Sequence, residues 1–174
     1  AYARGFLRMC RQNIVGAQGV QLQATPRGRD GAIDRPAADA IEAAWREWSR
    51  PANCDITGRQ SLREITAQAV TSAARDGEAF LLVVEGRDAG PWGVALQLID
   101  PQRCPVDFDE DLAGGAFIRH GVEFNKYGRP VAYHFTTTRA EDEAYRVGGR
   151  TFERVPASRV FHLFRADMVG QKRG

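Results

Sequence analysis

Residues 61–85 read SLREITAQAVTSAARDGEAFLLVVE, and this stretch decides the fold. Its first part has apolar residues at helical spacing behind Ser61-Leu-Arg-Glu64, a capping box that predicts a helix start. Asp76-Gly77 is typical of a helix end, and residues 79–85, of which the first six are apolar, are typical of a central strand. The hydrophobic period therefore changes at Gly77 from that of a helix to that of a strand.

The region before this stretch is expected to be mainly helical. Helical spacing and a following glycine predict one helix over residues 2–15. A second helix is expected after Asp34, a favoured N-cap residue. Between them, residues 20–23 (VQLQ) alternate as a short strand would. We expect Trp45 and Trp48 of the second helix to be largely buried beneath the sheet, with a base-stacking platform as the alternative.

The region after residue 77 is expected to form a sheet. Residues 125–130, NKYGRP, predict a reverse turn that joins two strands as a hairpin. The charged, glycine-terminated segment 138–150 predicts a solvated loop. No β-α-β alternation follows the helices, so the fold class is α+β, with N-terminal helices followed by a largely antiparallel β-sheet. The predicted strands are residues 79–85, 94–100, 117–124, 131–137, 152–155 and 160–164.

The composition suits a globular protein. The 174 residues are 43% hydrophobic and 26% charged, which excludes wholesale disorder. We expect a single domain over residues 1–174, with a helical part at 1–77, a sheet part at 78–164 and a linker tail at 165–174. Since the chain begins without Met and stops in a polar tail, we expect it to be a fragment of a longer protein.

Several protein classes are disfavoured by simple counts. The longest apolar run, residues 79–84, is far shorter than the roughly 20 residues that cross a bilayer, so no membrane span is predicted. No signal-peptide pattern opens the chain. Cys10, Cys54 and Cys104 are odd in number and widely spaced, which favours a reducing compartment over a disulfide framework or a zinc site. The net charge of +2 does not by itself indicate a nucleic-acid-binding protein.

Two charged segments are the candidate functional surfaces. Arg4, Arg8 and Arg11 share one helical face, which could meet phosphate groups or a neighbouring acidic patch; a merely solvated face remains the alternative. The second segment is an acidic run that could bind a divalent cation, but it lacks the spacing of an EF-hand and favours a solvated turn. Its members are Asp107, Asp109, Glu110 and Asp111.

The search for catalytic residues finds no complete set. Phosphate-loop and dinucleotide-binding signatures are absent. Nothing in the spacing of His120, His134 and His162 demands a metal, and Glu123 with Lys126 only approximates a nuclease site. The residues therefore predict a non-catalytic domain without cofactor or metal. The alternatives are a divalent-metal-dependent nucleic-acid-processing module and a free-standing DNA-binding module.

The order of short motifs along the chain resembles the portal proteins of tailed phages, specifically the lambda-like family. Each motif alone is weak, but together they cover nearly the whole chain, and they end in the Gln-Lys-Arg-Gly sequence of residues 171–174. The matching segments are residues 2–4, 13–16, 20–22, 45–48, 54–58, 61–62, 76–80, 96–100, 121–123, 127–134, 155–157, 160–163 and 170–174.

This resemblance implies a structural role in the virion. Portal proteins form ring-shaped homo-oligomers, typically dodecamers, at one capsid vertex, and double-stranded DNA passes through the ring. The terminase motor supplies the ATPase activity, and the other partners are capsid or scaffold proteins and head–tail adaptors. The resemblance implies that this chain is a wing-like portion, located in the virion and in the host cytoplasm during assembly, with no membrane partner. In such a ring, the arginine face and the acidic run would contact neighbouring subunits or phosphate.

Overall fold

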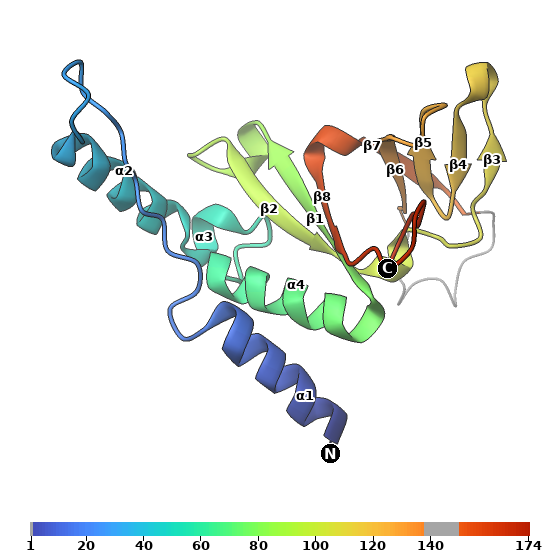
Figure 1. Ribbon diagram of the computed structural model, residues 1–174, viewed down its shortest axis with the longest axis horizontal. Coiled ribbons are helices and arrows are strands. Elements are labelled where there is room, and N and C mark those ends of the chain that lie inside the picture. The colour runs from blue at the N-terminus through green and yellow to red at the C-terminus, as the bar shows by residue number, and fades with distance from the viewer. Residues whose placement is uncertain (1, 138–149) are drawn as a thin grey trace. The chain divides into compact units, whose positions relative to one another are not determined.

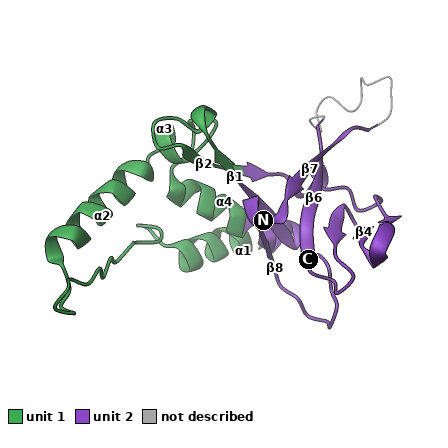
Figure 2. Ribbon diagram, turned by 90° about the horizontal axis from the view of Figure 1, so that it is seen from above, with its two compact units in different colours: residues 1–70, 84–97 green, residues 71–83, 98–174 purple. Residues whose placement is uncertain are grey.

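The computed structural model describes residues 2–137 and 150–174. The chain divides into two compact units, shown in Figure 2: unit 1 comprises residues 1–70 and 84–97, and unit 2 comprises residues 71–83 and 98–174. The predicted loop over residues 138–150 lies outside the described residues, apart from Arg150. The single-domain organisation stays a prediction.

Helices precede strands along the chain, as the colours in Figure 1 show. The predicted α+β class is therefore confirmed. Unit 1 begins with helix α1 (Tyr2–Cys10), which continues as a π-helical turn over Arg11–Val15. None of the α1 residues is buried. The short strand predicted at residues 20–23 is wrong: the segment has no regular secondary structure, and the nearest pairing is a single bridge between Arg27 and Ile33.

Helix α2 (Arg35–Trp48) begins where the sequence predicts. The Asp34 side chain accepts a hydrogen bond of 3.0 Å from the backbone N–H of Ala37, and a proline lies in the first turn. A short helix, α3 (Pro51–Cys54), follows. The indole of Trp48 donates to the carbonyl oxygen of Val94 at 2.9 Å, which ties the end of α2 to the start of strand β2 (Val94–Ile99).

Helix α4 (Leu62–Asp76) is opened by the predicted capping box. The backbone N–H of Ser61 donates to the Glu64 carboxylate at 2.8 Å, and the backbone N–H of Glu64 donates to the Ser61 hydroxyl at 3.3 Å. The helix ends at Asp76, and the Gly77 that follows has a φ of +88°, which favours glycine.

Strand β1 (Glu78–Glu85) is central, as predicted, in a three-stranded sheet of order β2-β1-β8. Strand β8 (Val160–Phe164) pairs with it antiparallel, with Phe80 opposite His162. The remaining strands form a second, antiparallel sheet of order β3-β4-β5-β6-β7, so the expectation of one sheet is corrected to two. Its strands are β3 (Glu110–Asp111), β4 (Phe117–Arg119), β5 (Val122–Phe124), β6 (Pro130–Thr136) and β7 (Phe152–Pro156).

The strand predicted over residues 117–124 is wrong in one respect, because it turns back on itself. His120 and Gly121 have φ values of +53° and +77°, which is the backbone of a tight two-residue hairpin turn. The chain therefore forms β4 and β5 as an antiparallel pair. The hairpin predicted around residues 125–130 is confirmed and joins β5 to β6.

The core of unit 2 is aromatic. The Phe80 ring lies edge-on to the rings of Tyr133 and Phe135, with centroids 5.7 and 5.5 Å away. The buried members of this cluster are Phe80, Ile99, Cys104, Val122, Phe124, Tyr133, Phe135 and Val155.

Candidate functional site

The predicted arginine face lies on α1 and the turn that follows it. Arg4, Arg8 and Arg11 are exposed, and none forms an ion pair with another described residue. The structure brings Arg8 and Arg11 together around a hollow of about 600 Å³ in unit 1 and adds Arg63 from α4. Because Arg63 lies about fifty residues further along the chain, the helical spacing used for prediction could not include it.

The electrostatics of this hollow follow from its residues. Hydrogen bonds from Ser61 lower the pKa of Glu64, and the charges of Arg63 and Arg11 lower it further. The Nε of Arg63 donates to the carbonyl oxygen of Gly16 at 3.3 Å. Among the described residues, no hydrogen bond or ion pair of the Arg8 or Arg11 side chain is found, and both side chains are exposed.

The acidic run is largely neutralised within unit 2. Asp107 accepts from Arg150 at 2.7 Å, and Asp111 accepts from Arg119 at 2.6 Å. Asp109 accepts the backbone N–H of His120 at 2.7 Å. Among the described residues, Glu110 is the member of the run whose carboxylate has no such partner. These pairs reduce the run's capacity to bind an external cation.

The histidines do not converge. The Nδ1 of His120 lies 2.8 Å from the carbonyl oxygen of Val106, and the Nε2 of His134 lies 3.2 Å from Glu123. Arg154 also binds Glu123 through two hydrogen bonds of 2.6 and 2.8 Å. Within residues 2–137 and 150–174, no group of three His, Cys, Asp or Glu residues could hold a metal ion. The metal-dependent alternative therefore lacks a ligand set in the described part of the chain.

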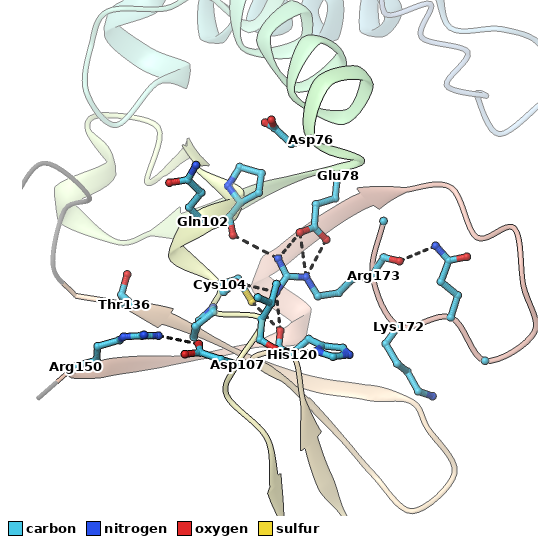
Figure 3. Close-up of a pocket in the computed structure, with 16 residues that line it drawn as sticks. Asp76, Glu78, Gln102, Cys104, Asp107, His120, Thr136, Arg150, Lys172 and Arg173 are labelled. Atoms are coloured by element: carbon cyan, nitrogen blue, oxygen red, sulfur yellow. Dashed lines mark hydrogen bonds and ion pairs between the residues drawn. The ribbon is translucent and has the colours of Figure 1, made fainter. Parts of the chain in front are cut away.

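Unit 2 contains a cavity of about 1110 Å³ with a buried ion cluster at its wall (Figure 3). Glu78 and Arg173 form an ion pair with side chains only 5% and 8% exposed. The Nε2 of His162 lies 2.9 Å from Oε2 of Glu78, and its Nδ1 lies 3.4 Å from the Tyr133 hydroxyl. The cluster thus joins strand β1, strand β8 and residue 173 near the end of the described chain.

The pKa of Glu78 depends on two opposing effects, burial and the neighbouring His162 and Arg173. Burial alone raises the pKa of a carboxyl group, but hydrogen bonds from His162 and Arg173 and their charges outweigh burial, so the pKa of Glu78 is lowered. Burial also raises the pKa of Tyr133 to about 12, which keeps its hydroxyl protonated beside His162. Sequence reasoning missed this cluster. The available signal is Glu78 itself, a carboxylate directly before six apolar residues, which needs a partner if it is buried.

Among the described residues, no helix combines the length and the apolar composition needed to cross a bilayer. What the structure defines is an α+β protein with an unpaired basic face and no assembled metal site in its described part.

Comparison with known proteins identifies the family. Residues 1–174 match the model of the phage portal protein, lambda family. The chain is also 30% identical over 173 residues to a protein named "Probable portal protein" from Halomonas phage phiHAP-1, covering 99% of this chain. The chain belongs to the lambda family of phage portal proteins. It spans 33% of the length of that Halomonas phage relative.

Proposed function

We propose that this chain is a structural, non-catalytic part of a phage portal, the ring at one capsid vertex through which DNA is packaged and ejected. The observation that supports this most strongly is the match to the lambda portal family across all 174 residues. The fold is consistent with it, since the described residues present charged surfaces and no assembled ligand set for a metal. We assign the chain to the wing-like portion.

The proposed partners are those of a portal ring. They are further copies of the same protein, which would form a dodecamer at full length, together with terminase, capsid or scaffold proteins and a head–tail adaptor. Double-stranded DNA would pass through the channel. The protein would be located in the virion and, during assembly, in the host cytoplasm.

We propose that the arginine face forms one side of the contact between neighbouring subunits. A ring requires a head-to-tail interface in which one surface meets a different surface on the next copy. Arg4, Arg8 and Arg11 are exposed and unpaired in the described structure, as one half of such a contact would be before assembly. The acidic run is the proposed opposite half. Since Asp107 and Asp111 already pair with arginines of their own chain, Glu110 is the member best placed to contribute.

The test reverses the charge of the three arginines in the full-length protein. We expect R4E/R8E/R11E to impair ring formation, measured by native mass spectrometry, because like charges across an interface are strongly unfavourable. The matched control is R29E/R35E/R59E, which makes the same charge change at three exposed positions of unit 1. Normal rings from R4E/R8E/R11E would overturn the interface assignment and leave the portal role intact.

Two further measurements separate the alternatives. Adding Glu110→Lys to the triple reversal is expected to restore part of the ring population, since opposite charges then face each other again. Divalent-metal-dependent cleavage of DNA by the purified chain would instead overturn the non-catalytic assignment. Binding of duplex DNA by the isolated chain, with an affinity that falls steeply with salt, would favour a DNA-binding module.

A further inference from the structure

We propose that unit 2 contains a guanidinium-binding site, and that residues 170–174 (GQKRG), here named the latch segment, bind it through Arg173. The site consists of the Glu78 carboxylate, three backbone carbonyl groups and the face of the Phe80 ring. The proposal rests on unit 2 alone and does not depend on the portal role.

The hydrogen-bond count indicates a site built for arginine. The guanidinium Nε donates to Glu78 at 3.0 Å, and Nη2 binds the same carboxylate. Nη1 donates to the carbonyl oxygens of Cys104 and His120, each at 2.7 Å, while Nη2 also reaches that of Pro101 at 3.4 Å. All five N–H donors of the guanidinium group therefore have an acceptor. A lysine ammonium has three donors around one atom and cannot reproduce this planar arrangement.

The walls of the site explain its selectivity for a flat cation. The Cζ of Arg173 lies 5.5 Å from the centre of the Phe80 ring, and the His162 ring is stacked on that same ring with centroids 4.3 Å apart. The positive φ of His120 belongs to the turn between β4 and β5 that supplies one of the carbonyl acceptors. The unusual backbone of that turn thus has a role in the site.

The remainder of the latch segment is also bound specifically. The Gln171 side chain accepts from the backbone N–H of Asp167 at 2.8 Å and donates to the carbonyl oxygen of Arg173 at 2.7 Å. The Lys172 ammonium lies 4.8 Å from the centre of the Phe124 ring. A Cβ atom on Gly77 would lie 2.8 Å from the carbonyl carbon of Gly174, so the two glycine backbones are in close contact. Lys172, Arg173 and Gly174 therefore contact the rest of unit 2, whereas Gln171 holds the conformation of the tail itself.

The test is chemical rescue of Arg173→Ala in the 174-residue chain. We expect this variant to have a lower thermal midpoint than the wild type, because the Glu78 carboxylate is left buried without its cation. Low-millimolar guanidinium chloride should raise the midpoint of Arg173→Ala in a saturable way and should not raise that of the wild type. Sodium chloride and methylammonium chloride, at the same concentrations, should give no comparable rise.

Matched variants distinguish a specific site from general destabilisation. Arg165→Ala removes an exposed arginine near the latch segment and should leave the midpoint close to that of the wild type. Adding Glu78→Gln to Arg173→Ala should abolish the rescue. Equal midpoints for Arg173→Ala and Arg165→Ala, or equal rescue by all three salts, would overturn the proposal.

A conservative variant covers the case in which Arg173→Ala does not fold. Arg173→Lys keeps the charge but loses the planar donor set, so we expect faster amide hydrogen exchange over residues 165–174 than in the wild type. Unchanged exchange in Arg173→Lys would show that any cation suffices and would overturn the guanidinium assignment.

Discussion

The indole Nε1 of Trp48 donates a hydrogen bond of 2.9 Å to the carbonyl oxygen of Val94, which lies 46 residues further along the chain. Trp48 is only partly buried, as is Trp45, whose ring centroid is 5.2 Å away. The expectation that both tryptophans are largely buried is therefore too strong. Trp48 holds the end of α2 to β2 by a polar contact as well as by packing.

The contributions of the Trp48 hydrogen bond and of its ring packing can be measured separately. We expect Trp48→Phe to lower the free energy of unfolding by about 1 kcal/mol, because it removes the hydrogen bond and keeps most of the ring. Trp48→Ala should cost about 3 kcal/mol, since it also removes the packing. Urea denaturation of the two variants measures the difference. Equal values for both would mean that the hydrogen bond dominates.

Stability should fall in acid. The Arg154 hydrogen bonds lower the pKa of Glu123, and the pKa of Glu78 is also lowered, in both cases from an ordinary value of 4.5. A carboxyl whose folded-state pKa is depressed stabilises the fold fully above its unfolded pKa and loses that contribution as pH falls through the folded one. We therefore expect the free energy of unfolding to decrease between about pH 5 and pH 2. Glu123→Gln should show a shallower decrease; an unchanged pH profile would contradict the assignment.

Thiol reactivity should be confined to one cysteine. Burial raises the pKa of Cys54 to about 11 and that of Cys104 to about 12, and both side chains are buried. Since the thiolate is the nucleophile, neither should react quickly near neutral pH. A disulfide exchange reagent should modify one thiol per native chain rapidly, and Cys10→Ser should abolish that fast phase. More than one fast thiol would show that a buried site opens.

The turn between β4 and β5 should be sensitive to a single methyl group. A Cβ atom on Gly121 would lie 2.9 Å from the Cys104 sulfur and 3.0 Å from the carbonyl oxygen of Pro105. Gly114 has a similar φ of +72° but open space around it, so Gly114→Ala isolates the backbone strain. We expect about 1 kcal/mol of destabilisation for Gly114→Ala and clearly more for Gly121→Ala, measured by thermal unfolding.

Local sequence patterns predicted the local structure well. The capping box at Ser61, the N-cap at Asp34 and the apolar run of β1 all form the expected elements, because each depends on neighbours within a few residues. The turn at His120 and Gly121 was missed because a single glycine inside a strand pattern is also compatible with a bulge in one continuous strand.

The candidate site was predicted only in part. The arginine face follows from helical spacing, whereas Arg63 enters its hollow from another helix. The acidic run is visible in the sequence, but its neutralisation by Arg119 and Arg150 depends on tertiary pairing. Such pairs join distant residues through the topology of the fold, so periodicity cannot reveal them.

The Glu78–Arg173 contact also fixes an order of events during protein synthesis. Its two residues are separated by 95 positions, so Glu78 is synthesised well before Arg173. All residues of unit 1 have been made once Gln97 is complete, whereas the buried Glu78 lacks its cation until residue 173 is added. At about 5–20 residues per second, several seconds pass in which the Glu78 carboxylate has no Arg173 to pair with. Unit 2 therefore cannot complete its buried ion pair before translation passes residue 173.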